Sequence, residues 1–123
     1  MKKYTKTHEW VEVSGKNATV GISEHAQDEL GDIVYVELPE LGKEVKSGEV
    51  LCSVESVKSA SDVYAPVSGK VVEVNKVLED TPETINKSAE SDGWIAKIEI
   101  SDLKEVDKLL DKTAYNEFLK EEK

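Results

Sequence analysis

Short runs of β-branched and aromatic residues, each closed by a turn sequence, constrain the fold of this chain more than any other feature. In 94–100 (WIAKIEI) apolar and polar residues alternate, as in a strand with one buried face. The segment 32–38 (DIVYVEL) is rich in β-branched residues and ends at Pro39. We expect strands over 10–13, 18–22, 32–38, 50–54, 63–65, 70–75 and 94–100.

Helix signals before residue 100 are fewer and short. Ser23 is a good N-cap for a helix over 24–30, and Gly31 follows at the position where glycine commonly ends a helix. The sequence Thr-Pro-Glu at 81–83 is typical of a helix start and predicts a short helix to about residue 86.

The chain changes character after residue 100. A C-terminal helical tail is expected over about 101–120, with Ser101 and Thr113 as caps of its two parts. Its apolar positions are Leu103, Val106, Leu109, Leu110, Tyr115, Phe118 and Leu119. The element order predicts a mostly β protein, a sandwich or flattened barrel with short helices and a C-terminal helical segment. We find no linker sequence, and therefore expect one domain over 1–123.

Charge excludes several classes of partner. The net charge is -10, so the field of the protein opposes binding to nucleic acid and to anionic membranes. The positive side chains are all lysines, which excludes arginine-based phosphate clamps. A single cysteine excludes an intramolecular disulfide, and the N-terminus shows no apolar run typical of a signal peptide. We expect a soluble cytoplasmic protein.

Lys58 stands midway between two predicted strands, in Ser-Val-Lys-Ser-Ala-Ser-Asp at 56–62. Small and hydroxyl residues surround it and suit a tight turn, so an enzyme could reach its amine. A solvated lysine has a pKa near 10.4 and is a poor nucleophile, which argues against catalysis through a Schiff base. Acylation of the amine is the more reasonable role, because it removes the charge and creates a long arm. The plain alternative is one more surface lysine.

The segment VESVKSASDVYAPVSG, residues 54–69, closely resembles the lipoylation segment of the glycine cleavage system H-protein family. The resemblance continues in order through HEWV at 8–11, VGISEHAQDELGDI at 20–33, VELP at 36–39 and DGWIAKI at 92–98. It spans essentially the whole chain. One stretch departs: 86–92 (NKSAESD) lacks the proline and tyrosine that the family often carries there, which weakens any inference about contacts of this loop.

The resemblance implies a non-catalytic carrier with a lipoyl-type β barrel or sandwich. It implies lipoate joined by an amide to Lys58, attached by a lipoate ligase or lipoyl transferase. The arm would take an aminomethyl group from the P protein (glycine decarboxylase) to the T protein (aminomethyltransferase), and the L protein (dihydrolipoyl dehydrogenase) would reoxidise it. Glu9 and Asp62 are candidates to meet the cationic amine. The alternatives are an exposed strand-edge acid for Glu9 and a turn-forming aspartate for Asp62.

Other functions stay open at this point. An H-like protein could instead relay lipoyl or octanoyl groups to other complexes through the same lysine. Biotin carriers usually place methionines beside the modified lysine, whereas Val57 and Ser59 flank Lys58. A binding module with an unmodified lysine is the remaining possibility.

A few further residues have a chemical and a structural interpretation. Cys52 could be a redox partner of the arm, but a small buried hydrophobe on a strand is the favoured interpretation. His8 and His25 have no cysteine at ligand spacing, so no zinc site is expected, and His25 is interpreted as a local hydrogen-bonding residue. Trp10 and Trp94 are expected to pack in the core from strands.

Overall fold

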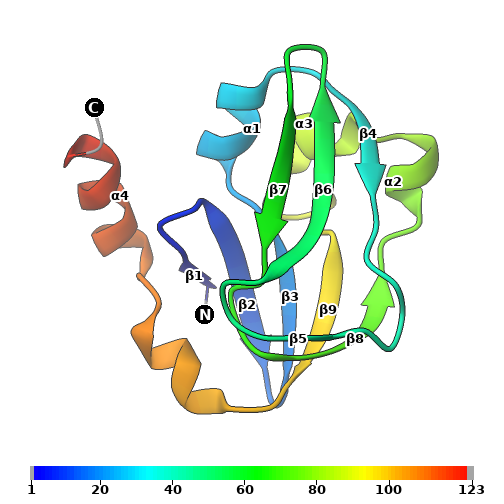
Figure 1. Cartoon of the computed structure of the whole chain (residues 1–123). Coiled ribbons are helices and arrows are strands. Elements are labelled where there is room, and N and C mark those ends of the chain that lie inside the picture. Colours follow the sequence, from blue (N-terminus) through cyan, green and yellow to red (C-terminus); the bar gives the residue numbers. More distant parts are fainter. Residues whose placement is uncertain (1, 122–123) are drawn as a thin grey trace.

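Two antiparallel sheets form the body of the molecule (Figure 1). They are seen in a computed structural model that describes residues 2–121. The larger sheet has the order β1-β2-β3-β9-β8-β5 and the smaller one the order β4-β6-β7. The strands of the larger sheet are β1 (Lys2–Tyr4), β2 (Glu9–Ser14), β3 (Asn17–Ile22), β9 (Ala96–Ile100), β8 (Gly69–Val74) and β5 (Glu44–Val45). Those of the smaller sheet are β4 (Ile33–Glu37), β6 (Val50–Ser56) and β7 (Ala60–Tyr64).

The core lies between the sheets, because alternate side chains of each strand point inward. In β9 the burial alternates along Ala96–Ile100, with Ile98 fully buried and Glu99 exposed. The apolar core draws on both sheets, with Val11, Val20, Leu51, Val54, Val63, Val71 and Ile98 among its members. The expected mostly β sandwich with an apolar core is therefore confirmed.

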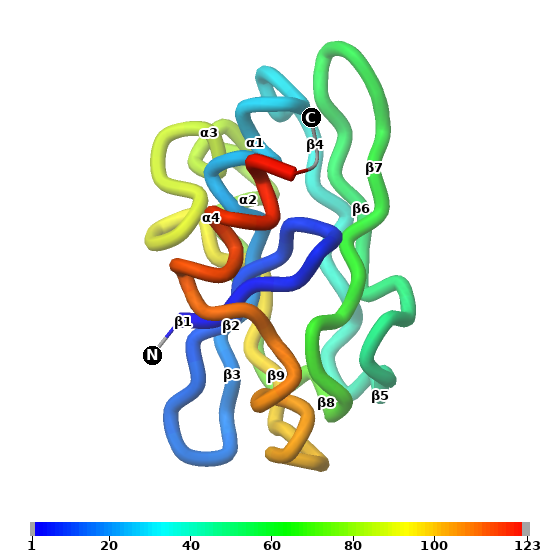
Figure 2. Tube along the Cα trace, turned by 90° about the vertical axis from the view of Figure 1, so that its left-hand side faces the viewer, coloured from blue at the N-terminus to red at the C-terminus, as the bar shows by residue number. Residues whose placement is uncertain are grey.

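Helices close the ends of the sandwich. Helix α1 (Glu24–Leu30) and the short helices α2 (Val77–Asp80) and α3 (Thr84–Ser88) lie near the end from which the β6–β7 hairpin projects (Figures 1 and 2). The 3₁₀ helix η1 (Leu103–Lys108) lies at the opposite end, and α4 (Lys112–Glu121) returns along β1. Tyr4 of β1 stacks on Tyr115 of α4, with ring centroids 4.5 Å apart.

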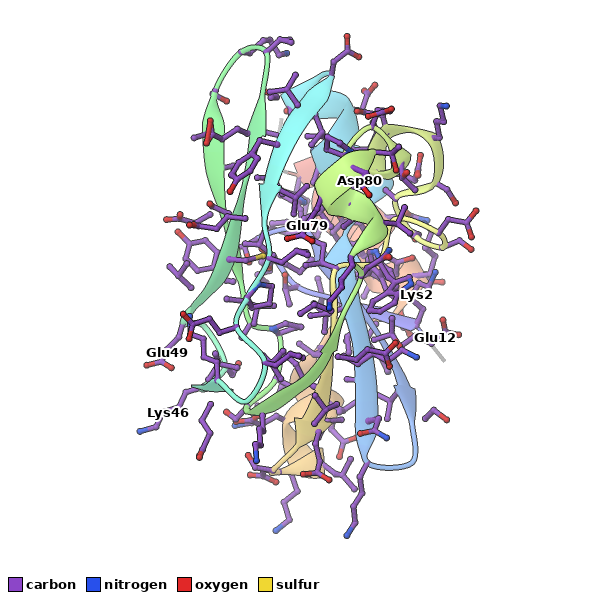
Figure 3. The ribbon with its side chains drawn as sticks, turned by 90° about the vertical axis from the view of Figure 1, so that its right-hand side faces the viewer. Lys2, Glu12, Lys46, Glu49, Glu79 and Asp80 are labelled. Carbon is purple, nitrogen blue, oxygen red and sulfur yellow. The ribbon has the colours of Figure 1, made fainter. Side chains whose placement is uncertain are left out.

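Charged side chains cover the outside, as the composition predicts. Lys46 and Glu49 extend away from the body in the turn before β6 (Figure 3). No helix within residues 2–121 is long and apolar enough to span a membrane.

Several element boundaries differ from the sequence-based expectation. Strands β1 and β5 and helix α2 were not predicted, and Trp94 precedes β9 rather than lying in it. Thr81 was expected to begin a helix, but it ends α2, with its amide donating to Val77. In the tail, Asp102 and Asp111 accept the capping hydrogen bonds that were expected at Ser101 and Thr113. The carboxylates of these aspartates are the stronger acceptors for exposed amides.

Gly69 is a position where the fold tolerates no side chain. A Cβ built there lies 2.1 Å from the carbonyl oxygen of Glu99 on the neighbouring strand. Gly69→Ala must push β8 and β9 apart, so we expect a loss of at least about 3 kcal/mol in the free energy of unfolding. Gly15→Ala is the control: Gly15 has a φ of 63° but open space around it, so only the backbone cost of about 1–2 kcal/mol applies. Urea titration of both variants measures the difference, and equal losses would contradict the steric explanation.

Candidate functional site

Lys58 lies at the tip of the β6–β7 hairpin and is exposed. The pairing of Glu55 with Ala60 leaves four residues for the turn. Ser56 builds this turn: its amide donates to the Ser59 carbonyl at 2.8 Å, and its hydroxyl accepts from the amides of Lys58 and Ser59, both at 3.1 Å. The expected hairpin is confirmed, and the turn presents the lysine in one fixed place.

The segment after α1 supports the tip. The Val57 amide donates to the Asp32 carbonyl at 3.0 Å. Gly31, with a φ of 82°, ends α1 as expected, and a Cβ built on it lies only 3.2 Å from Cε of Lys58. The aliphatic stem of Lys58 therefore lies across bare backbone, in a cradle that any other residue would fill.

Asn86 forms hydrogen bonds to the backbone segment that makes this cradle. Its side-chain amide donates to the Gly31 carbonyl at 2.9 Å, and its Oδ1 accepts from the Ile33 amide at 2.8 Å. Asn86 begins the stretch in which the chain departs from the resemblance, and sequence reasoning assigned it no role. Nothing local marks it, because both partners lie more than fifty residues away in the chain.

A hollow of about 410 Å³ lies between α1, the segment over residues 7–8 and Ser61 of β7. It is lined by Thr7, His8, His25, Ala26, Glu29, Leu30 and Ser61. Leu30 directly precedes the glycine cradle, and Ser61 is three residues past the lysine. A second hollow of about 310 Å³ shares Thr7 and continues to Glu9 and Tyr64. The two hollows adjoin at Thr7, and we call the surface from the hairpin through them to Glu9 the path.

Glu9 is buried at the end of this path, with 2% of its surface exposed. Its carboxylate accepts hydrogen bonds from the hydroxyls of Thr5 (2.6 Å) and Thr7 and from the Tyr64 amide (3.1 Å). The alternative of an exposed strand-edge acid is therefore wrong. Burial raises the pKa of Glu9 above its ordinary value, although the three hydrogen bonds act in the opposite direction. All three donors are uncharged, so none of them neutralises the carboxylate.

Asp62 lies elsewhere. It is an exposed residue inside β7, opposite Ser53, so the interpretation as a turn-forming aspartate is wrong. It lines a separate hollow of about 510 Å³ together with Glu37, Lys43 and Cys52. Thr7 and Glu9 line the same hollow, whereas Asp62 lines a different one.

The remaining candidate residues make contacts within the fold. Cys52 is buried, and desolvation raises the pKa of its thiol to about 12, so it is a thiol rather than a reactive thiolate at neutral pH. Trp10 is buried and donates from Nε1 to the Ala89 carbonyl. His8 and His25, distant in sequence, have ring centroids 4.7 Å apart. Among residues 2–121, no three potential ligands come close enough together to hold a metal ion.

The raised pKa of Glu9 has a measurable effect on stability. A group whose pKa is higher in the folded than in the unfolded state loses stability as the pH rises from the unfolded value, here 4.5, through the folded value. We therefore expect the wild type to lose stability relative to Glu9→Gln over that interval, with a constant difference above it. Glu12→Gln, an exposed acid on the same strand, is the control. Thermal unfolding from pH 4 to 8 measures these differences, and a wild type that gains stability relative to Glu9→Gln would reverse the assigned sign.

Comparison with known proteins covers nearly the whole chain. Residues 2–122 match the sequence model of the family described as Glycine cleavage H-protein. The glycine cleavage system H protein of Thermotoga maritima is 63% identical over 122 residues, covering 99% of this chain and 98% of that protein. The protein of the same name from Phenylobacterium zucineum is 53% identical over 117 residues, covering 95% and 97%. A crystal structure of a glycine cleavage system H protein from Mycobacterium marinum superposes with a TM-score of 0.86 at 35% identity, covering 98% of this chain and 95% of that one.

Proposed function

The chain belongs to the glycine cleavage H-protein family, the lipoyl carriers of the glycine cleavage system, and on this premise we propose that Lys58 carries lipoate through an amide bond. The observation that supports the choice of lysine is its exposed place on a fixed hairpin tip, with its stem in the Gly31 cradle. The amine is accessible to a lipoate ligase or lipoyl transferase.

The path to Glu9 suits a long arm. Ala60 and Tyr64 are about 13 Å apart along β7 at about 3.3 Å per residue. A bare lysine reaches only roughly 6 Å from its Cα, so only an acylated side chain spans this path. When bound, lipoate supplies a disulfide that accepts an aminomethyl group and is reduced in doing so.

The chain's own contribution is to shelter a cationic cargo. Glu9 is a buried carboxylate that accepts hydrogen bonds from three uncharged donors. A cationic amine beside it would form a favourable charge–charge interaction in a partly desolvated site. Glu9 is therefore the proposed contact of the aminomethyl amine. Asp62, on its separate depression, is the second candidate and contributes less in this proposal.

In this role the chain is a carrier subunit without catalytic activity of its own. It would receive the aminomethyl group from the P protein, present it to the T protein and be reoxidised by the L protein. Because the lipoyl group is covalently attached to the carrier, its effective concentration is high in the active site of each enzyme that the carrier binds.

Reconstitution tests this function against the lipoate relay, which the names of the relatives do not favour. The lipoylated protein is mixed with P, T and L proteins, glycine, tetrahydrofolate and NAD⁺, and carbon dioxide release is followed. We expect glycine-dependent release that requires the lipoylated protein. No release above the protein-free background, together with transfer of its lipoyl group to another lipoyl domain, would instead support the relay.

A further inference from the structure

We propose that Tyr115 of α4 is a positioning residue for the Glu9 site, acting through His8. This inference rests on the proposed role of Glu9 as the cargo contact. Tyr115 belongs to the C-terminal helix and touches neither the lysine tip nor the Glu9 carboxylate in the hydrogen bonds described above. Its hydroxyl nevertheless reaches the segment that carries Thr7 and Glu9.

His8 has an unusual backbone conformation. Its φ is 73°, the left-handed region that residues other than glycine adopt only where surrounding contacts hold them. Its amide donates to the Thr5 carbonyl at 3.2 Å, and its carbonyl accepts from the Ser23 amide at 2.9 Å. The first bond closes the turn over residues 5–8, directly before β2, and the second joins His8 to the residue that follows β3.

The Tyr115 hydroxyl fixes the side chain of His8 in the same place. Nδ1 of His8 and the Tyr115 oxygen share a hydrogen bond of 2.8 Å. The same oxygen lies 2.7 Å from the hydroxyl of Ser23, which in turn accepts from the Ala26 amide and caps α1. Tyr115 is 2% exposed. One buried hydroxyl thus connects α4, the N-terminus of α1 and the strained residue His8.

The position of His8 makes this connection relevant to the site. His8 lies between Thr7 and Glu9 in the chain, and the turn that it closes brings the hydroxyls of Thr5 and Thr7 onto the Glu9 carboxylate. Without the Tyr115 hydroxyl, His8 keeps its backbone hydrogen bonds and its ring contacts with His25 and Phe118 but loses the hydrogen bond at Nδ1, and we expect the turn over residues 5–8 to loosen. The Thr7 hydroxyl then no longer donates a hydrogen bond to the Glu9 carboxylate, although Glu9 itself is unchanged.

A purely structural role for Tyr115 is the alternative, because its ring stacks on Tyr4. Two matched variants separate the roles. Tyr115→Phe and Tyr4→Phe each remove one buried hydroxyl from the same stacked pair and keep both rings. The Tyr4 hydroxyl donates to Glu90 at 2.6 Å and not to His8. Only Tyr115→Phe should therefore disturb the Glu9 site.

The first measurement uses the unmodified protein. The ¹³C signal of the Glu9 carboxyl carbon is followed by NMR against pH in wild type, Tyr115→Phe and Tyr4→Phe. Losing the Thr7 hydrogen bond moves the midpoint to higher pH in Tyr115→Phe, and Tyr4→Phe retains the wild-type midpoint. Lys6 and Lys108, which line the same hollow, are present in all three proteins. An unchanged midpoint in Tyr115→Phe, or the same shift in both variants, would overturn the proposal.

The second measurement uses lipoylated protein loaded with the aminomethyl group. We expect loss of ammonia to be about three- to tenfold faster in Tyr115→Phe, as for one lost hydrogen bond, and unchanged in Tyr4→Phe. Glu9→Gln serves as the reference. If Glu9→Gln releases ammonia no faster than wild type, the proposed shelter itself is wrong. If Glu9→Gln is faster and Tyr115→Phe equals wild type, only the inference about Tyr115 fails.

Discussion

Lys58→Ala will accept no lipoyl group from a lipoate ligase and will support no glycine-dependent carbon dioxide release with P, T and L proteins. The chain has other exposed lysines, and Lys16 also lies in a hairpin turn, but the stem of Lys58 lies in the Gly31 cradle. Because the side chain is exposed, its removal should change the free energy of unfolding by no more than about 0.5 kcal/mol. Intact mass and the decarboxylation rate measure the two losses.

Two variants control this experiment. Lys46→Ala removes another exposed lysine, from the turn before β6, and should be lipoylated and active like wild type. Lys58→Arg keeps the positive charge but not the primary amine, so it should fail like Lys58→Ala. Full lipoylation of Lys58→Ala, or undiminished carbon dioxide release, would show that the acylated residue lies elsewhere.

Glu9→Gln will shorten the lifetime of the aminomethyl cargo on the lipoylated protein by about thirtyfold or more, because removing one member of a buried charge pair costs about 2 kcal/mol or more. Glutamine is of the same size but uncharged, and its amino group meets one of the donors that now point at the carboxylate. Ammonia release from the loaded protein, followed without the T protein, measures the lifetime.

Faster release could come from partial unfolding rather than from loss of the Glu9 contact, so two controls separate these effects. Glu12→Gln, on the exposed face of the same strand, should retain the wild-type lifetime. The thermal unfolding temperature of each variant shows whether faster release reflects partial unfolding. A Glu9→Gln protein that holds its cargo as long as wild type would remove Glu9 from the proposal.

The sequence predicted most of the strands because their patterns are local. The alternation in 94–100 requires one buried face wherever the strand is placed, and β9 has that face. Strands β1 and β5 have three and two residues, too few for any period to show. Their pairing is decided by neighbours distant in the chain, such as Leu110, which bridges to Tyr4.

The same distinction separates the predicted from the unpredicted parts of the site. Lys58 could be placed at a hairpin tip because the strands and turn that hold it lie within a few residues. The burial of Glu9 could not, since it depends on Tyr64, fifty-five residues further along. The contact of His8 with Tyr115 spans 107 residues and leaves no local signal.

The central claim, that Lys58 is the lipoyl-bearing residue, is tested most directly by mass spectrometry of protein purified from its own cells. Intact mass followed by fragmentation identifies the modified residue and its acyl group. We expect one lipoyl group, on the peptide containing Lys58. A chain isolated without any acyl group on Lys58, which lipoate ligase also leaves unmodified, would contradict it.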